Sequence, residues 1–284
     1  MSQDRPFDRA LRRQRRDRAA MRFAGADYLH RLVADDLLDR LGAVTRTFGR
    51  ALVLGASGGY IETKLRAQGI EVVSADPGFA FARAAGGVQA DEDRLPFGDG
   101  AFDLAVSLGV LDSVNDLPGA LLLIGRALKP DGLFLGAFAG AGSLPRLRSA
   151  MLAADAAEGA AAPHIHPQID VRAAGDLLTR AGFALPVVDC HGIDVRFPHL
   201  LSLVRDLRAM GATNVLAARS TRPIGRNGLA AAMADFADHA DDDGKTTERF
   251  EIVHMLGWAP APSQPQPARR GSATVSLADA LKRR

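Results

Sequence analysis

The sequence predicts an α/β fold in which helices cover both faces of a mostly parallel sheet. Short apolar runs typical of buried strands alternate with stretches of helical periodicity, and the connections between them are short. A glycine-rich turn, residues 55–59, follows the first apolar run. Acidic residues, Asp76 and Asp91, follow the next two. This alternation is typical of a doubly wound sheet, whose carboxyl edge binds ligands.

The N-terminal part predicts a basic arm and a helix that precede the sheet. Residues 1–22 hold eight arginines against three aspartates and are expected to form a basic arm or an exposed helix. Residues 28–41 repeat apolar side chains on one helical face, and Gly42 is expected to end that helix.

The first half of the domain contains the strongest strand and helix patterns. Expected strands cover residues 51–54, 70–75, 87–90, 102–107 and 133–138. Expected helices cover residues 60–68 and 116–128, and a lysine-proline-aspartate-glycine turn follows the second.

The second half is less regular. Helices are expected at residues 170–180, 198–210 and 226–240, and strands at 186–193 and 250–258. We therefore expect a lead-in over 1–48, a domain over 49–258 with an insertion at about 143–250, and a proline-rich linker with a basic tail over 259–284.

Composition excludes several classes of protein. The 284 residues are 47% hydrophobic and 24% charged with a net charge of +2, which argues against disorder and against a continuous nucleic-acid-binding face. The single cysteine, Cys190, excludes an internal disulfide and is expected in the core. No apolar stretch suits a membrane span or a secretory signal. We expect a cytoplasmic protein. A second expectation is that it contacts the inner face of the membrane peripherally.

Three turns at the expected carboxyl edge favour an adenosine-containing ligand. Glycines at 55–59 allow close backbone approach, Asp76 lies where a carboxylate accepts ribose hydroxyls, and Asp91 precedes an apolar slot suited to adenine. Each has a structural alternative: a tight turn, a strand-end cap and a solvated acidic loop. A P-loop is excluded because no Gly-Lys-Ser/Thr follows the glycines.

Together these motifs resemble the class I S-adenosylmethionine-dependent methyltransferases. The resemblance covers roughly residues 50–140 and includes the motifs at 95–97 (LPF), 102–103 (FD) and 128–132 (LKPDG). It implies a Rossmann-like seven-stranded sheet and S-adenosylmethionine as cofactor. The cofactor-binding residues that it implies are Gly55, Ala56, Ser57, Gly59, Asp76, Pro77, Asp91, Glu92 and Ser107.

A closer resemblance, to the complex I assembly factor 5 family, reaches both ends of the chain. Its motifs lie at residues 7–11 (FDRAL), 90–92 (ADE), 114–118 (VNDLP), 163–165 (PHI), 257–258 (GW) and 270–276 (RGSATVS). The family's mitochondrial member is described as hydroxylating an arginine of an iron–sulfur subunit of respiratory complex I. The resemblance therefore implies an enzyme that acts on a protein side chain, with that subunit as partner. Malonyl-acyl-carrier-protein methyltransferases are similar relatives.

Departures from the methyltransferase pattern keep other functions open. Val53 replaces the usual acidic residue, Ser57 replaces the middle glycine, and Asp112-Ser113 replace a His-Trp pair. A lost charge-assisted hydrogen bond of about 1.5–3 kcal/mol would weaken cofactor binding roughly ten- to a hundredfold. The alternatives are a non-catalytic assembly or chaperone module and a malonyl-carrier carboxyl methyltransferase.

The sequence assigns no catalytic residue and no metal site. His164, His166 and Asp170 could be arranged as two histidines and a carboxylate for iron, but their proline-flanked loop favours surface or gating roles. Three scattered histidines and Trp258 are expected to be structural; the histidines are His191, His199 and His254.

Overall fold

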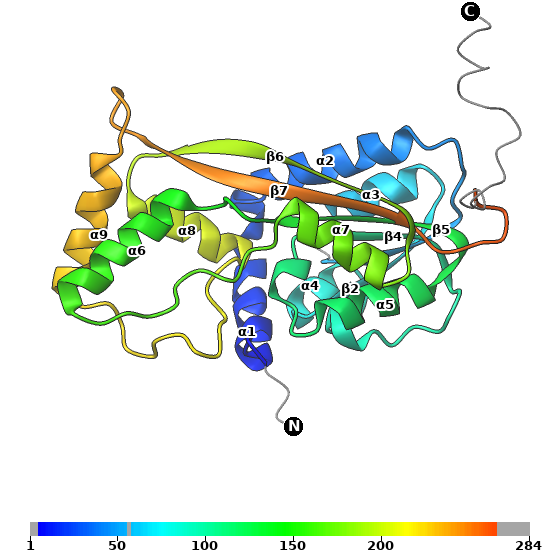
Figure 1. Ribbon diagram of the computed structural model, residues 1–284, viewed down its shortest axis with the longest axis horizontal. Helices are drawn as coiled ribbons and strands as arrows, with labels where there is room; N and C mark the ends of the chain where they lie inside the picture. The colour runs from blue at the N-terminus through cyan, green and yellow to red at the C-terminus, as the bar shows by residue number, and fades with distance from the viewer. Residues whose placement is uncertain (1–4, 56–57, 266–284) are drawn as a thin grey trace, which may run out of the picture.

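The computed structural model describes residues 5–55 and 58–265. These residues form a seven-stranded sheet in the order β3-β2-β1-β4-β5-β7-β6 (Figure 1). The strands from β3 to β5 are parallel, and β7 runs antiparallel to both of its neighbours. The strand bounds are β1 Arg50–Leu54, β2 Glu71–Asp76, β3 Val88–Gln89, β4 Phe102–Leu108, β5 Leu128–Ala139, β6 Ala184–Phe197 and β7 Thr246–Trp258. The order reverses between β1 and β4, which is where doubly wound sheets bind ligands.

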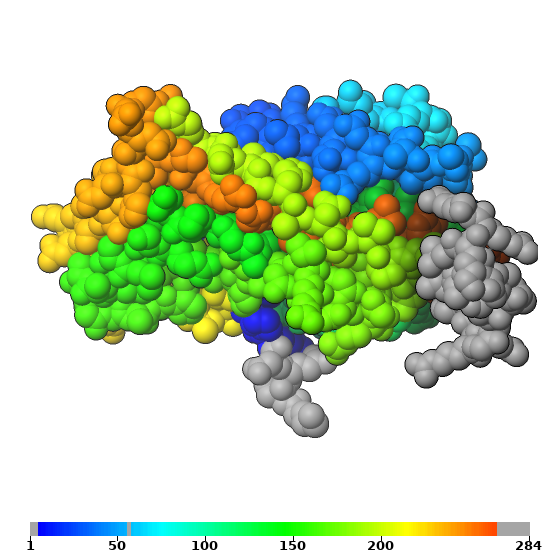
Figure 2. Space-filling model, turned by 45° about the horizontal axis from the view of Figure 1, so that its top comes forward, coloured from blue at the N-terminus to red at the C-terminus, as the bar shows by residue number. Residues whose placement is uncertain are grey.

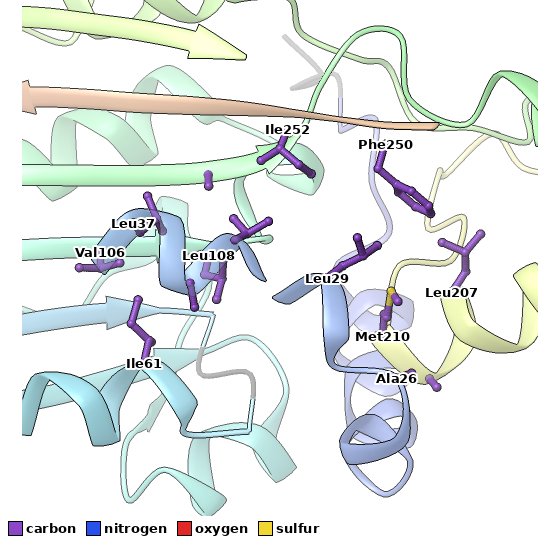
Figure 3. Packing of buried hydrophobic residues seen from close by; sticks show 14 of the residues in the cluster. Ala26, Leu29, Leu37, Ile61, Val106, Leu108, Leu207, Met210, Phe250 and Ile252 are labelled. Atoms are coloured by element: carbon purple, nitrogen blue, oxygen red, sulfur yellow. The ribbon is translucent and has the colours of Figure 1, made fainter. Parts of the chain in front are cut away.

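Helices cover both faces of this sheet. In Figure 1, α2 (Tyr28–Gly42) and α3 (Tyr60–Ala67) lie above it, while α4 (Phe79–Ala84), α5 (Leu117–Ala127) and α7 (Val171–Arg180) lie below. Two apolar layers result. One joins α2 and α3 to the sheet (Figure 3), and the other joins α5 and α7 to its opposite face.

Strands β6 and β7 extend beyond the parallel strands and carry a second lobe. There α6 (Pro145–Glu158) packs against α9 (Arg226–Asp238), and α8 (Leu200–Met210) lies between this pair and the sheet (Figure 1). Figure 2 shows α6 and α9 side by side at the end of the molecule. The lobe shares the apolar layer of α2, because Ala150, Leu203 and Phe236 are fully buried in that layer.

Helix α1 (Arg9–Ala20) crosses the carboxyl edge of the sheet. Its Arg12 and Arg16 are each only 5% exposed. The expectation of an exposed basic helix is therefore wrong, because acidic residues from three other segments surround these guanidinium groups.

The parallel α/β sheet and most of its elements confirm the sequence-based expectations, with several differences. Strand β7 begins at Thr246 rather than at residue 250, and neither α4 nor α6 was predicted. Residues 129–132, expected to form a turn, lie within β5, which begins at Leu128. Cys190 is exposed, because it lies on β6 at the edge of the sheet rather than in the core. Among the described residues, none of the helices combines the length and apolarity needed to cross a bilayer.

Candidate functional site

The glycine turn follows β1 and begins against the carboxyl end of β4. Gly55 has a φ of +82°, and a Cβ added to it would lie 2.4 Å from the carbonyl oxygen of Leu108. Only glycine fits that position. Gly59, with a φ of +75°, is the N-cap of α3. Two expected cofactor-binding residues, Ala56 and Ser57, lie outside the described residues.

Asp76, at the end of β2, is completely buried and bonded on both carboxylate oxygens. Oδ1 accepts from the Gly78 amide at 2.7 Å and from Nε of Arg16 at 2.8 Å, and Oδ2 accepts from Nη2 of Arg16 at 2.6 Å. The Arg16 guanidinium also lies over the Phe81 ring. Pro77, the next residue after Asp76, is also buried. A planar guanidinium facing a carboxylate in this bidentate manner is a strong charge-assisted contact.

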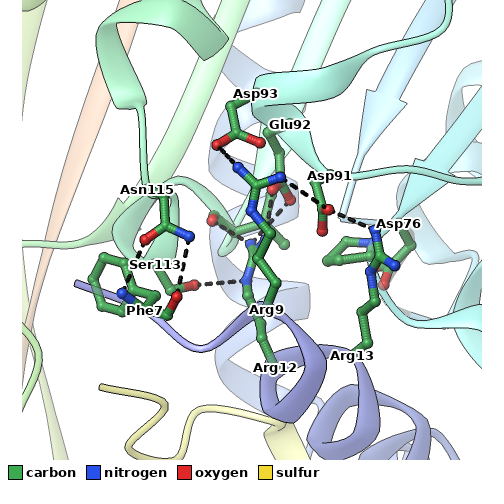
Figure 4. Close-up of polar contacts among 12 residues, drawn as sticks. Phe7, Arg9, Arg12, Arg13, Asp76, Asp91, Glu92, Asp93, Ser113 and Asn115 are labelled. Carbon is green, nitrogen blue, oxygen red and sulfur yellow. Dashed lines mark hydrogen bonds and ion pairs between the residues drawn. The ribbon is translucent and has the colours of Figure 1, made fainter. Parts of the chain in front are cut away.

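The acidic triplet after β3 faces the same helix (Figure 4). Arg12 donates to both oxygens of Glu92, at 2.6 and 3.0 Å. Arg13 donates to Oδ2 of Asp91 at 2.6 Å, and Arg9 bonds Asp93. The α1 arginines thus bond all three acids, including the two expected to bind cofactor.

Local sequence explains why α1 presents this row of guanidinium groups. Residues four apart lie on one helical face, so Arg12 and Arg16 point the same way. Asp8 caps the helix by accepting from the Leu11 amide. Just before it, the Phe7 amide donates to Oδ1 of Asn115, and the Asn115 amide donates back to the Phe7 carbonyl. These contacts fix the start of α1 beside the loop after β4.

The charges around Arg12 favour the contact between α1 and the carboxyl edge of the sheet. Burial alone lowers the pKa of Arg12, but the facing Glu92 carboxylate outweighs it and raises that pKa above its ordinary value. Arg12 also donates to the Val110 carbonyl at 2.8 Å and to the Ser113 hydroxyl at 3.1 Å. The guanidinium therefore links the triplet after β3 to the loop after β4.

A cavity of about 1330 Å³ opens beside this edge, between the end of β4 and the second lobe. Gly109, Asp112, His30 and His166 line its β4 side. Burial, with Arg16 nearby, lowers the pKa of His30 to about 4, so its imidazole is neutral at physiological pH. Its Nδ1 is buried and has no hydrogen-bond partner among the described residues. Oδ2 of Asp112 lies 3.8 Å from Nδ1 of His166.

Several arginines from α1, α8 and the loop after α8 also line the cavity. Arg15, Arg18, Arg208 and Arg219 all line it. Burial, reinforced by the charges of the other three, lowers the pKa of Arg15. The cavity therefore has an acidic and imidazole-containing end at β4 and a cationic rim.

The expected site residues lie close together in space, but their carboxylates are already bonded to arginines of α1. Gly55, Asp76, Asp91 and Ser107 all lie at the carboxyl ends of adjacent strands. Ser107 is fully buried, with no partner for its hydroxyl among the described residues. These groups suit an adenosine-containing cofactor in kind and position. The α1 arginines hold the two carboxylates, so a cofactor fits only if α1 releases them.

Sequence reasoning missed Arg12, Arg16 and His30 as members of this site. The signal was present in the four-residue spacing of the arginines and in the acidic triplet that could balance them. The three residues considered for an iron site each have another contact in the structure. His164 bonds Asp155 at 2.8 Å, Nε2 of His166 accepts from the Val215 amide, and Asp170 caps α7.

Comparison with known proteins identifies close relatives. The methyltransferase domain family matches residues 25–186. The human protein named mitochondrial arginine-hydroxylase NDUFAF5 is 38% identical over 96% of this chain and 82% of its own length. The zebrafish (Danio rerio) protein of the same name is also 38% identical, over 97% and 89%. A malonyl-[acyl-carrier protein] O-methyltransferase of Laribacter hongkongensis is 32% identical over 86% and 87%.

Solved structures agree on the fold. A candidate methyltransferase from Bacillus halodurans gives a TM-score of 0.55 at 15% identity and covers 80% of this chain and 99% of that one. Phosphoethanolamine N-methyltransferase 2 of Haemonchus contortus, solved with S-adenosylhomocysteine, gives a TM-score of 0.50 at 14% identity over 80% of this chain and 52% of that one. At these identities the likeness concerns the fold alone.

Proposed function

Because this chain belongs to the class I methyltransferase family, in the group of the arginine hydroxylase NDUFAF5, we propose that it is an enzyme that modifies a protein side chain during assembly of respiratory complex I. The proposal rests on similarity over nearly the full length of the relatives. The observation that carries it in the structure is the cavity at the end of β4, which is large enough for an extended side chain and its flanking peptide.

The cofactor in this proposal is S-adenosylmethionine. Gly55 and Gly59 would shape the turn beside it, Asp76 would accept the ribose hydroxyls, and Asp91 would accept the adenine amine. When bound, the cofactor supplies an electrophilic methyl group. The chain's own contribution is to orient the acceptor and exclude water. Helix α1, which already covers the edge, would first have to release Asp76 and Asp91.

The side chain that enters the cavity would be an arginine, held by Asp112. Asp112 is the carboxylate on the β4 side of the cavity, and a carboxylate pairs with a guanidinium in a planar, directed way. His30 stays neutral beside it and adds no positive charge to the arginines that line the cavity, so the incoming guanidinium would bind at the Asp112 end. The insertion over residues 143–250 would form the lid, since most of the opposite wall comes from it.

The test is to incubate the purified chain with the iron–sulfur subunit of complex I from the same source and S-adenosylmethionine, and to sequence the subunit by mass spectrometry. We expect one arginine to gain the mass of a methyl group, which S-adenosylmethionine supplies, and Asp112→Asn to lower the yield about tenfold or more. A parallel incubation with dioxygen and a reductant tests for gain of an oxygen atom. Asp99→Asn, an exposed change, is the matched control. An unmodified subunit would contradict the proposal.

A non-catalytic assembly module is the second candidate, favoured by the bidentate hold of Arg16 on Asp76. It predicts that the chain supports assembly without binding cofactor. Methyl ester formation on an acyl carrier would instead favour the carboxyl methyltransferase activity named for other relatives. The vertebrate relatives are named as mitochondrial. For this chain we propose a cytoplasmic location, with contact to the membrane complex.

A further inference from the structure

A second polar cluster lies between α2 and the β6–β7 edge of the sheet. It contains Asp36 from α2, His191 from β6 and His254 from β7. One donor atom from each of the three lies within 4.8 Å of the other two. Ile252, two residues before His254 and so on the same face of β7, lines the cavity. The cluster thus adjoins the wall of the cavity but shares no residue with the strand-end site.

His254 is the unusual member, since it is only 2% exposed and neither ring nitrogen has a hydrogen-bond partner among the described residues. Nε2 lies 2.7 Å from Oδ2 of Asp36 but outside hydrogen-bonding geometry. Nδ1 lies 3.9 Å from Oδ1 of Asp189. A buried polar group without a partner is costly, so native structures normally provide one.

The surroundings of His254 offer several ligand atoms and only one cation. Its ring stacks on His191, with ring centroids 5.0 Å apart. Two carboxylates, those of Asp36 and Asp189, share the single guanidinium of Arg40. The cluster therefore presents imidazole nitrogens and carboxylate oxygens to a cation.

We propose that Asp36, His191 and His254 bind a divalent transition-metal ion such as Zn²⁺, which ties α2 to the β6–β7 edge. Two imidazoles and one carboxylate form a donor set typical of zinc and other first-row transition metals. Ligand distances of about 2.0–2.2 Å place tetrahedral donor atoms about 3.3 Å apart. Donor atoms at the 4.8 Å limit must therefore approach by about 1.5 Å, and the stacked His191 ring must turn toward the ion.

Surrounding groups support the assignment. Asp189 faces the other ring nitrogen of His254, as the outer carboxylate does in a carboxylate–histidine–metal arrangement. Arg40 bonds both oxygens of Asp189, at 2.6 and 2.8 Å, and holds Asp36 only through one longer contact of 3.2 Å. Arg40 can therefore keep Asp189 in place while Asp36 turns to the ion.

The test is calorimetric titration of the full, tag-free chain with ZnCl₂ after removal of metal with a chelator. We expect one Zn²⁺ per chain, and binding at least about tenfold weaker in Asp36→Asn and in His191→Ala. Asp39→Asn, on the exposed side of the same helix, is the matched control and should bind as wild type does. Both ligand variants change half-exposed residues, so the chain is expected to stay folded, which circular dichroism checks.

A second readout is independent of calorimetry. Zn²⁺ should raise the melting temperature of the wild type and of Asp39→Asn but not of Asp36→Asn. Failure of the folded wild type to bind at millimolar Zn²⁺ would overturn the site. Equal binding by wild type and both ligand variants would also overturn it, because the ion would then lie elsewhere.

Discussion

Replacing Arg16 with alanine removes the guanidinium that closes the carboxyl edge over Asp76. In the wild type, Asp76 accepts two hydrogen bonds from Arg16 and one from the Gly78 amide. Any ligand that uses Asp76 must first displace Arg16. If α1 and S-adenosylmethionine compete for this carboxylate, the variant should bind the cofactor more tightly than the wild type.

The size of the effect follows from the contact that is lost. A hydrogen bond to a charged group contributes about 1.5–3 kcal/mol, and every 1.4 kcal/mol changes a dissociation constant about tenfold. Removing one such contact from the competition should therefore tighten binding about ten- to a hundredfold. The same change leaves a buried carboxylate without its cation, which should lower the free energy of unfolding by about 3–5 kcal/mol.

The assay is calorimetric titration with S-adenosylmethionine, combined with urea unfolding of the same samples. Arg5→Ala, which removes an equal charge from an exposed position just before α1, is the control and should change neither quantity. A folded Arg16→Ala chain that binds no more tightly than the wild type would refute the competition. Absence of binding in both chains would also count against the cofactor and favour the assembly module.

Two further predictions concern stability. The pKa of His30 is about 4 in the folded chain and about 6.5 in the unfolded chain. The unfolded chain therefore binds more protons between these values, and stability should fall as the pH drops from about 6.5 to 4, by up to about 1.4 kcal/mol per pH unit. Urea midpoints across this range should vary less in His30→Gln than in the wild type; identical profiles would contradict the role of His30. Gly87→Ala should destabilise by about 1–3 kcal/mol, because its Cβ would lie 2.2 Å from the Ser74 carbonyl oxygen. Gly98→Ala, with no atom within 4 Å of its added Cβ, should be nearly neutral, and equal unfolding midpoints for the two glycine variants would contradict the packing argument.

Local patterns in the sequence were enough to predict the strand-end half of the site. A glycine after an apolar run and an acidic residue after the next are set by the chain's immediate neighbours. Gly55 and Asp76 therefore lie where the sequence places them, at the ends of β1 and β2. The parallel sheet followed from the same alternation. Cys190 was misplaced because its strand pattern does not reveal that β6 is an edge strand.

The tertiary structure alone decided what those residues contact. Arg16 meets Asp76 across 60 residues of chain, and Arg12 meets Glu92 across 80. A run of arginines is solvated in most sequences, and only the packing of α1 against the sheet desolvates these two and pairs them with acids. In the sequence, His254 is likewise only a single polar residue within an apolar strand. Its relation to Asp36 depends on how α2 lies over the β6–β7 edge. The sequence determined which chemical groups lie at the carboxyl edge of the sheet. Long-range packing determined which of these groups form ion pairs with α1. The energy of an ion pair depends on the distance between its charges, and no local sequence pattern encodes that distance.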